Sequence, residues 1–149
     1  MDITENITFA YTAMIGYRPN DLTVVVLGHF LVEYLLNKII KAKCKNAAKI
    51  VGYSFSIKLE LVNSMDLLTE DLYKNIKNLN GIRNSIVHTL EVDLQKRIFY
   101  KSTGQKIVVK VAKSKNPEKD YLRLLSHGIL TNLQNHMLLT LKVSPRYKF

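Results

Sequence analysis

Apolar residues recur at spacings of three to five over several segments of the chain, a pattern that predicts amphipathic helices. A first short helix is expected over residues 3–15, ahead of Arg18-Pro19. Asp21 is suited to cap a second helix, because its side chain can accept hydrogen bonds from the free N–H groups of the first turn. Lysines close this helix, which suits the negative pole of a helix C-terminus. Its apolar positions are Leu22, Val25, Val26, Phe30, Leu35, Ile39 and Ile40.

Three further segments complete the helical pattern. Residues 55–62 mark a third, shorter helix that follows a break at Gly52. A fourth begins at Thr69, where a capping threonine is followed by two acids in the first turn. The last begins at Asn116-Pro117, a capping residue followed by a proline at the first helical position. We expect this last helix to bury Tyr121, Leu124, Leu125, Leu130, Leu133, Met137 and Leu141.

Residues 97–111 follow a different pattern. Residues 98–100 and 107–111 are rich in β-branched and aromatic side chains and flank a turn near Gly104, which predicts a β-hairpin. The expected fold class is therefore mainly α: a helical bundle of about five helices with a basic β-hairpin inserted before the last helix. At 149 residues the chain fits a single domain, residues 1–149.

The composition is that of a globular protein, with 47% hydrophobic residues. No run reaches the roughly 18 consecutive apolar residues that a membrane span needs. Acids stand near Met1, where a secretory signal carries lysine or arginine. These features predict a cytoplasmic protein without a membrane partner. The single cysteine, Cys44, excludes an intramolecular disulfide and a cysteine-rich zinc site.

The charge of the chain is strongly positive and unevenly distributed. Twenty-two basic against twelve acidic residues leave a net charge of +10. Residues 38–49 contain five lysines and no acid, residues 93–119 carry a net +6, and residues 142–149 add three basic residues. This asymmetry favours a polyanionic partner, of which nucleic acid is the commonest. Solvated lysine-rich faces without a partner are the alternative interpretation.

Arg83 interrupts the apolar stripe of the fourth helix. An arginine there costs stability unless it reaches water, pairs with a carboxylate or faces something other than the core. Asn84 follows it directly, and His88 comes five residues after it. Five residues turn a continuous helix by about 140° and advance it by about 7.5 Å. Arg83 and His88 therefore need either a bend at Asn80-Gly81 or a second subunit to form one site.

Residues 79–88, with the sequence Leu-Asn-Gly-Ile-Arg-Asn-Ser-Ile-Val-His, resemble the signature of the HEPN superfamily: an arginine, a polar residue, and a histidine after a short gap. Residues 55–71 and Glu33 also resemble HEPN patterns, so the resemblance covers about residues 21–90 and the final helix. It implies an α-helical domain that dimerises through the motif. Many HEPN domains are metal-independent ribonucleases that act as toxins or defence effectors, and others only bind RNA or nucleotides.

The resemblance also implies partners. They are RNA, a second copy of the chain and, for a toxin, an antitoxin protein. Some toxin members carry a tyrosine two residues after the histidine, where a partner antitoxin modifies it. This chain has Leu90 at that position, which puts control by that route in doubt.

These residue types suit the cleavage of RNA by its own 2′-hydroxyl. A histidine ordinarily titrates near neutral pH and can take or give the proton, contributing about 10²–10⁴-fold, and this is the role predicted for His88. The guanidinium of Arg83 can hold a phosphate bidentately and stabilise the charge of the transition state. Asn84 can position a phosphate oxygen or the base. The chemistry needs no metal and no cofactor, and the predicted RNA-binding residues of the hairpin are Lys106, Lys110 and Lys113.

Four alternatives stay open. A HEPN-like regulatory module that binds RNA or nucleotides without cutting uses the same basic surface. In a purely structural interpretation, Arg83 is an ion-pair partner of Glu33 and His88 is an exposed helix residue. His29 and Glu33 lie four residues apart, a spacing that can bind a metal, although a satisfied polar pair is the simpler interpretation. A helical DNA-binding regulator ranks last, because no helix-turn-helix pattern is visible.

Overall fold

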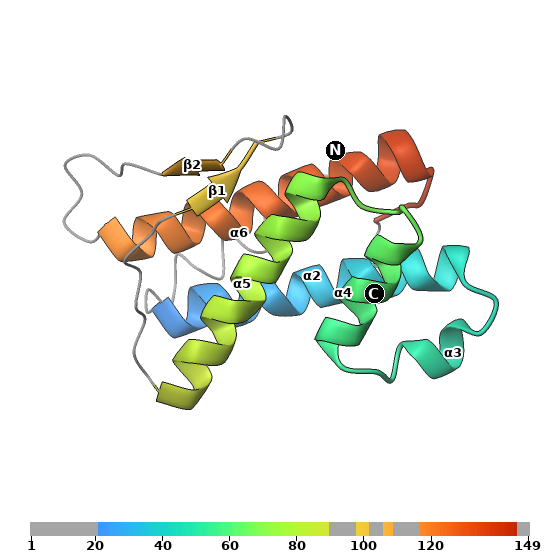
Figure 1. Cartoon of the computed structure of the whole chain (residues 1–149), viewed down its shortest axis with the longest axis horizontal. Helices are drawn as coiled ribbons and strands as arrows, with labels where there is room; N and C mark the ends of the chain where they lie inside the picture. The colour runs from blue at the N-terminus through green and yellow to red at the C-terminus, as the bar shows by residue number, and fades with distance from the viewer. Residues whose placement is uncertain (1–20, 90–97, 102–105, 109–116, 146–149) are drawn as a thin grey trace.

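The computed structural model describes residues 21–89, 98–101, 106–108 and 117–145, which form a helical bundle with one pair of strands (Figure 1). The mainly α fold with strands before the last helix is confirmed. The helix expected over residues 3–15 lies outside the described residues. The elements are α2 (Asp21–Lys43), α3 (Ala47–Ile50), α4 (Phe55–Ser64), α5 (Glu70–Thr89), β1 (Ile98–Tyr100), β2 (Lys106–Val108), α6 (Pro117–His136) and the π-helix η1 (Met137–Leu141).

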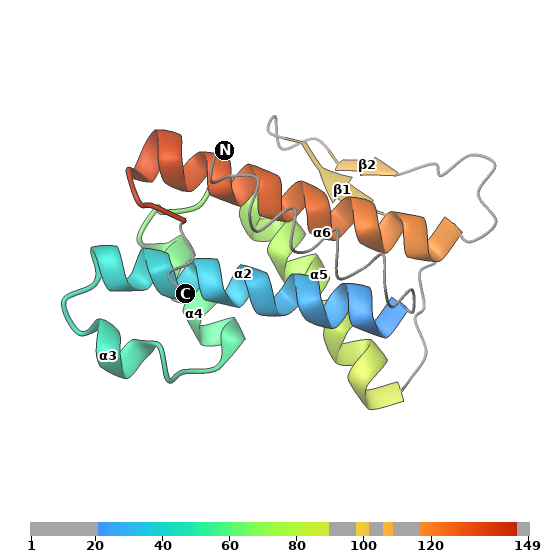
Figure 2. The same cartoon turned by 180° about the vertical axis from the view of Figure 1, so that it is seen from behind.

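The central helix of the bundle is α2. It contacts α6, α5 and α4, with α6 running alongside it and α5 crossing it, as the opposite views of Figures 1 and 2 show. Complete burial of a leucine or isoleucine contributes about 1.5–3 kcal/mol, so this shared core supplies most of the drive to fold. The largest fully buried side chains are Tyr121, Leu35, Leu36, Ile39, Ile40, Leu59, Ile76, Leu79, Leu122, Leu125 and Ile129.

The apolar character of α2 follows from its central position. Thr23–Lys43 is long and apolar enough to cross a membrane by length and composition, a test that core helices of soluble proteins also pass. In this bundle 56% of the apolar window is buried against the other helices. A helix packed on several sides needs apolar residues around most of its circumference, which accounts for the composition without a bilayer.

The two strands pair antiparallel, with Ile98 opposite Val108 and Tyr100 opposite Lys106. The predicted hairpin is therefore present as a strand pair, although the turn expected near Gly104 lies outside the described residues. Each strand is three residues long. Such a short pair is not stable alone, so its position depends on contacts with the helices.

Both α5 and α6 position β1. The buried amide of Asn75 on α5 forms two 2.8 Å hydrogen bonds with the main chain of Tyr100, donating from Nδ2 to the carbonyl and accepting at Oδ1 from the N–H. The next residue back, Phe99, packs on α6 at Gly128, where an added Cβ would lie 3.1 Å from the ring. A side chain at this position would push the ring by a few tenths of an ångström, so glycine favours the close approach of the strand to α6.

Some local features differ from the sequence expectations. The sequence pattern did not predict the short helix α3 or the π-helix η1 that follows α6. Leu124, expected in the core, is 50% exposed, because the buried face of α6 is centred near Leu125 and Ile129 and position 124 points the other way. Val26 and Phe30, on the predicted stripe of α2, are 40% and 59% exposed.

Candidate functional site

The candidate site lies on the second half of α5, near the contacts of that helix with α2 and α4. Helix α5 is continuous from Glu70 to Thr89, so Asn80-Gly81 does not interrupt it. Arg83 and His88 consequently remain about 140° and about 7.5 Å apart along one helix. The expected break at Asn80-Gly81 is not present, which leaves a second subunit as the way to unite the two side chains.

Arg83 is oriented by its neighbour but not neutralised. Its Nη1 donates a 3.0 Å hydrogen bond to Oδ1 of Asn84, and its side chain is half-buried. Within the described ranges no ion pair joins Arg83 to a carboxylate. A guanidinium carries five N–H donors, so one bond to Asn84 leaves several for solvent or a ligand. A fixed, uncompensated guanidinium is suited to bind phosphate.

Glu33 does not pair with Arg83. Its Oε1 lies 2.7 Å from Nζ of Lys58 on α4, whose side chain is only 3% exposed. A buried ammonium needs this partner, because removing one member of a buried pair costs about 3–5 kcal/mol. The structural Arg83–Glu33 ion pair is therefore wrong, whereas the negative charge of Glu33 does act on His29 and, against the effect of burial, raises the pKa of its imidazole. The carboxylate joins α2 to α4.

His29 brings a buried imidazole from α2 to the site. Its Nε2–H donates a 3.0 Å hydrogen bond to Oδ1 of Asn80, and its ring packs on Phe55 with 4.0 Å between centroids. Burial lowers the pKa of His29 from its ordinary value of 6.5. The hydrogen bond to Asn80 opposes this shift in pKa, and the charge of Arg83 lowers the pKa further. His29 is thus neutral at pH 7 and lies within electrostatic reach of Arg83.

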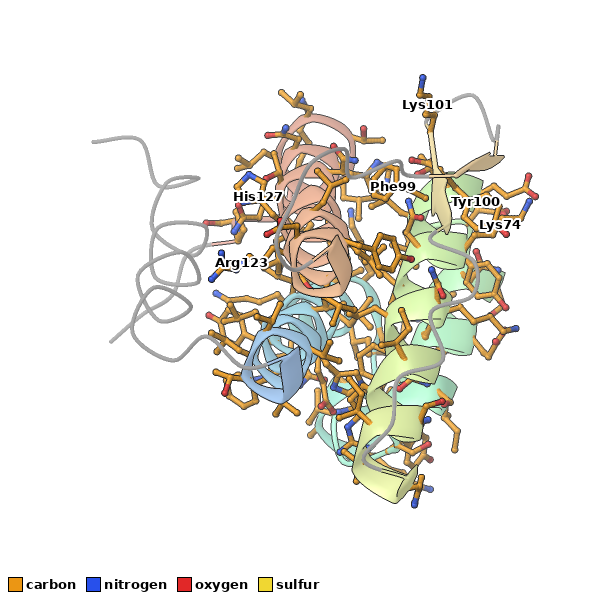
Figure 3. All side chains as sticks on the ribbon, turned by 90° about the vertical axis from the view of Figure 1, so that its left-hand side faces the viewer. Lys74, Phe99, Tyr100, Lys101, Arg123 and His127 are labelled. Carbon is orange, nitrogen blue, oxygen red and sulfur yellow. The ribbon has the colours of Figure 1, made fainter. Side chains whose placement is uncertain are left out.

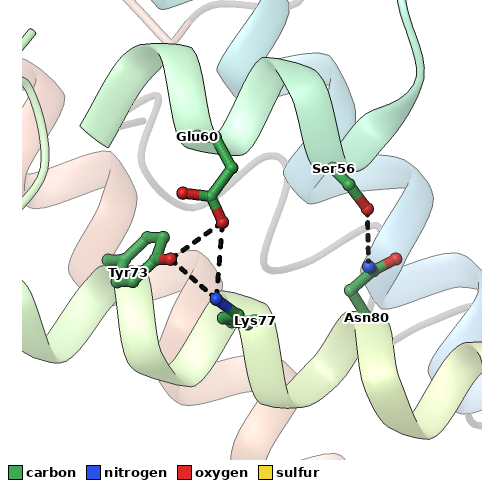
Figure 4. A network of polar contacts seen from close by, with 5 residues as sticks. All are labelled: Ser56, Glu60, Tyr73, Lys77 and Asn80. Atoms are coloured by element: carbon green, nitrogen blue, oxygen red, sulfur yellow. Dashed lines mark hydrogen bonds and ion pairs between the residues drawn. The ribbon is translucent and has the colours of Figure 1, made fainter. Parts of the chain in front are cut away.

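Polar contacts between α4 and α5 hold Asn80 in place (Figure 4). Nδ2 of Asn80 donates to Oγ of Ser56 at 3.3 Å, so both ends of the amide are used. One to two turns earlier, the hydroxyl of Tyr73 donates to Oε1 of Glu60 at 2.8 Å, and Lys77 donates to both groups. This network fixes the α4–α5 packing on which the positions of Asn80 and the next turn depend.

His88 lies apart from this cluster. It is exposed in the last turn of α5, and that end of the helix projects past α2 in Figures 1 and 2. Of the predicted RNA-binding lysines, Lys106 is the first residue of β2, whereas Lys110 and Lys113 lie outside the described residues. The structure therefore brings Arg83, Asn84 and His29 close together and leaves His88 free to meet another molecule.

Sequence reasoning missed two members of the cluster, His29 and Asn80. In the sequence His29 was considered only because it lies four residues before Glu33. Its hydrogen-bond partner, Asn80, is 51 residues away in the chain. A histidine on the otherwise apolar helix α2 indicates a hydrogen-bond partner on another element, because a buried histidine requires one. In the part of the chain that the structure describes, no group of three or more His, Cys, Asp or Glu side chains is arranged to hold a metal ion.

The stability of the protein should depend on pH through His29. Because its pKa in the folded state lies below 6.5, its stabilising contribution is complete above about pH 6.5 and is lost as pH falls through the lower folded-state pKa. We expect the free energy of unfolding in urea to fall in this range by up to about 1.4 kcal/mol per pH unit from this group.

The variants His29→Gln and His127→Gln test this dependence. His29→Gln stays uncharged at every pH, so its free energy of unfolding should fall less steeply below about pH 6.5 than that of the parent. His127 is exposed on α6, so His127→Gln should follow the parent. Equal pH dependence in His29→Gln and the parent would show that the folded-state pKa of His29 is not lowered.

The described residues define a mainly α bundle with a docked strand pair and a polar cluster around Arg83 on α5. No protein-family model, no curated protein and no solved structure matches the chain.

Proposed function

We propose that the protein is a metal-independent endoribonuclease that acts as a cytoplasmic homodimer. The observation that carries this proposal is the state of Arg83: half-buried, held by the 3.0 Å hydrogen bond to Asn84, and without a carboxylate partner in the described ranges. Such a guanidinium is suited to a phosphate. The net charge of +10 favours a polyanionic substrate. The resemblance of residues 79–88 to the HEPN signature points to the same activity.

In the proposed reaction the nucleophile belongs to the RNA. The 2′-hydroxyl loses its proton to His88 and forms a bond to the adjacent phosphorus, while the bond from phosphorus to the 5′-oxygen breaks. Water supplies the proton that the departing 5′-oxygen takes up. Arg83 stabilises the added negative charge on the phosphoryl oxygens, and Asn84 keeps the guanidinium oriented. The products are a 2′,3′-cyclic phosphate and a 5′-hydroxyl.

A second copy of the chain fits the exposed apolar residues around the cluster. Phe30 follows His29 directly and Val26 lies one turn before it, and these two side chains are 59% and 40% exposed. Val87, one turn after Arg83, is 44% exposed. Large apolar side chains that face solvent are available to a protein interface. A two-fold interface here brings Arg83 and His88 of different copies into one cleft.

Biological roles follow from the resemblance. Many HEPN domains act as toxins or defence effectors, and we propose this role here, with an antitoxin protein as the partner of a toxin. The separation of Arg83 from His88 on one helix favours a second candidate, a module that binds RNA without cutting it. A cleavage assay distinguishes the ribonuclease from the binding module, because both bind RNA and only the ribonuclease produces new RNA ends.

RNA binding should depend steeply on salt if the lysine-rich segments follow the phosphates. Each phosphate contact contributes about −0.7 to the slope of log affinity against log salt for a single strand. Replacing Lys106, Lys110 and Lys113 together with alanine should weaken binding and reduce the magnitude of that slope by up to about 2. Fluorescence anisotropy of a labelled RNA over a range of salt concentrations measures both quantities.

The matched control is the double variant Lys74→Gln/Lys77→Gln. These two ammonium groups are already paired with Glu70 and Glu60, so their loss should change RNA affinity little. A triple variant with the parent's affinity and salt slope would exclude the hairpin lysines from the RNA contact.

A further inference from the structure

A cavity of about 420 Å³ lies between the first turn of α5, β1 and the C-terminal half of α6. Its volume is within the range of small-molecule sites. Asp71 on its wall and Arg83 are twelve residues apart on α5, which corresponds to about 18 Å along the helix. The cavity is thus separate from the Arg83 cluster, and the proposed nuclease reaction makes no use of it.

Asp71 is the acidic residue among those that line this cavity. Asp71 is 6% exposed, and within the described ranges no hydrogen bond or ion pair joins its side chain to another residue. Its neighbour Glu70 is by contrast exposed and paired with Lys74. Among the described residues, the side-chain oxygens and nitrogens that are buried without a partner belong to other residues, so the carboxylate oxygens of Asp71 are open to the cavity. Asp71 therefore favours a ligand that presents N–H or O–H donors.

Phe99 supplies a flat apolar wall. Figure 3 shows its ring directed between α5 and α6, while Lys101, two residues on, extends outward. The ring is held in place because Asn75 fixes the main chain of the next residue and Gly128 leaves room beneath it. An aromatic face of this kind stacks against a planar ring, which contributes about 1–3 kcal/mol for a nucleobase.

The remaining lining residues are hydrogen-bonding groups near the opening. Asn132 and Asn135 are exposed amides of α6 that can donate and accept, and Lys101 is an exposed ammonium directly after β1. His136 donates from Nε2 to the carbonyl oxygen of Leu67 at 3.1 Å, so its position is fixed by the fold. The cavity is thus lined by a carboxylate, an aromatic ring, two amides, an imidazole and an ammonium group.

We propose that this cavity binds a guanine nucleotide. The guanine edge presents N1–H and the 2-amino group side by side, which matches the two oxygens of Asp71, while the ring stacks on Phe99. The amides of Asn132 and Asn135 can donate to O6 and N7, and Lys101 meets the phosphate. A free cation also satisfies a carboxylate, but the net charge of +10 repels cations and attracts a polyanion that carries donor groups.

The same chemistry has two sources, a free guanine nucleotide and a guanosine within single-stranded RNA. Calorimetric titration of the full chain with GMP, IMP and AMP tests the shared chemistry, because IMP lacks only the 2-amino group. GMP should bind, and IMP and AMP should bind about tenfold or more weakly. Asp71→Asn should lower GMP affinity by about tenfold or more and reduce the preference for GMP over IMP.

Two variants serve as matched controls. Glu70→Gln changes the adjacent acid, which does not line the cavity, and should leave GMP affinity unchanged. Arg83→Ala should also bind GMP like the parent, which separates this site from the proposed catalytic one. Phe99→Leu keeps an apolar residue but removes the stacking surface, and should weaken all three nucleotides.

Two short RNAs identify the source, one with a single guanosine and one with inosine at that position. If the parent binds the guanosine RNA more tightly than the inosine RNA, and Asp71→Asn removes this difference, the ligand of the cavity is a guanosine within RNA. If only the free nucleotides show the preference for guanine, the ligand is a free nucleotide. No binding of GMP to the parent up to about 1 mM, equal binding of GMP and IMP, or unchanged GMP affinity in a folded Asp71→Asn variant would overturn the proposal.

Discussion

Replacing His88 with alanine is expected to lower the rate of RNA cleavage by about 10²-fold or more, because it removes the proposed proton carrier. RNA affinity should stay near that of the parent, since His88 is exposed at the end of α5 and its loss leaves Arg83 and Asn84 in place. Arg83→Ala should lower the rate by a similar factor and also weaken binding, because it removes the phosphate clamp. Single-turnover cleavage of an end-labelled single strand measures the rates.

Three further variants make this experiment specific. His127→Ala removes another exposed histidine and should cut RNA like the parent. Arg83→Lys keeps the charge but loses the bidentate geometry, so it should recover binding more than cleavage. His29→Gln tests the second imidazole near Arg83. If His29→Gln abolishes cleavage while His88→Ala cuts at the parent rate, the proton carrier is His29 and the role of His88 is wrong. Thermal melts establish that each variant is folded.

Mixing two inactive variants should restore cleavage. On the continuous helix α5, Arg83 and His88 point about 140° apart, and the proposed site takes them from different copies. In an equimolar mixture of Arg83→Ala and His88→Ala, half of the dimers are mixed and each contains one intact site. We therefore expect about a quarter of the parent rate. Neither variant alone should exceed about a hundredth of that rate.

The complementation test depends on the state of assembly. Light scattering should give a mass near 34 kDa, twice the 17.1 kDa of one chain. The variant Phe30→Glu, which places a charge on the exposed apolar residue beside His29, should shift the mass toward one chain and prevent rescue. Absence of rescue in a mixture of stable dimers would contradict a site shared between subunits.

The fold was predictable from sequence where a local pattern decides the structure. Helices α4 and α5 begin within a residue of the apolar pattern and the capping threonine that predicted them, and α2 and α6 occupy segments that the sequence assigned to helices. The sequence did not predict which apolar residues of each helix are buried and which are exposed to solvent. Phe30 and Leu124 stand on plausible stripes and are exposed, because burial depends on which neighbours surround a helix and sequence periodicity does not contain that information.

The candidate site was predictable only in part. Arg83 and Asn84 were identified from an arginine on an apolar stripe, which is a local conflict between residue type and position. The partners of the buried polar groups come from distant parts of the chain. Asn80 binds His29, Lys58 binds Glu33, and Asn75 binds the main chain of β1. Such pairs form between side chains of helices that cross, and the spacing of residues in the sequence does not show which helices cross. For this reason Glu33 was assigned to Arg83, whereas its partner is Lys58.

The most direct measurement of the proposed function is cleavage of single-stranded RNA by the purified chain in excess EDTA, with analysis of the new ends. We predict cleavage at the same rate with and without EDTA, and products that carry 2′,3′-cyclic phosphate and 5′-hydroxyl ends, because the nucleophile is the 2′-hydroxyl of the RNA itself. A substrate with 2′-deoxyribose at the cleaved position should resist. Failure of the parent to cut any RNA, or cleavage that EDTA abolishes, would contradict the metal-independent nuclease.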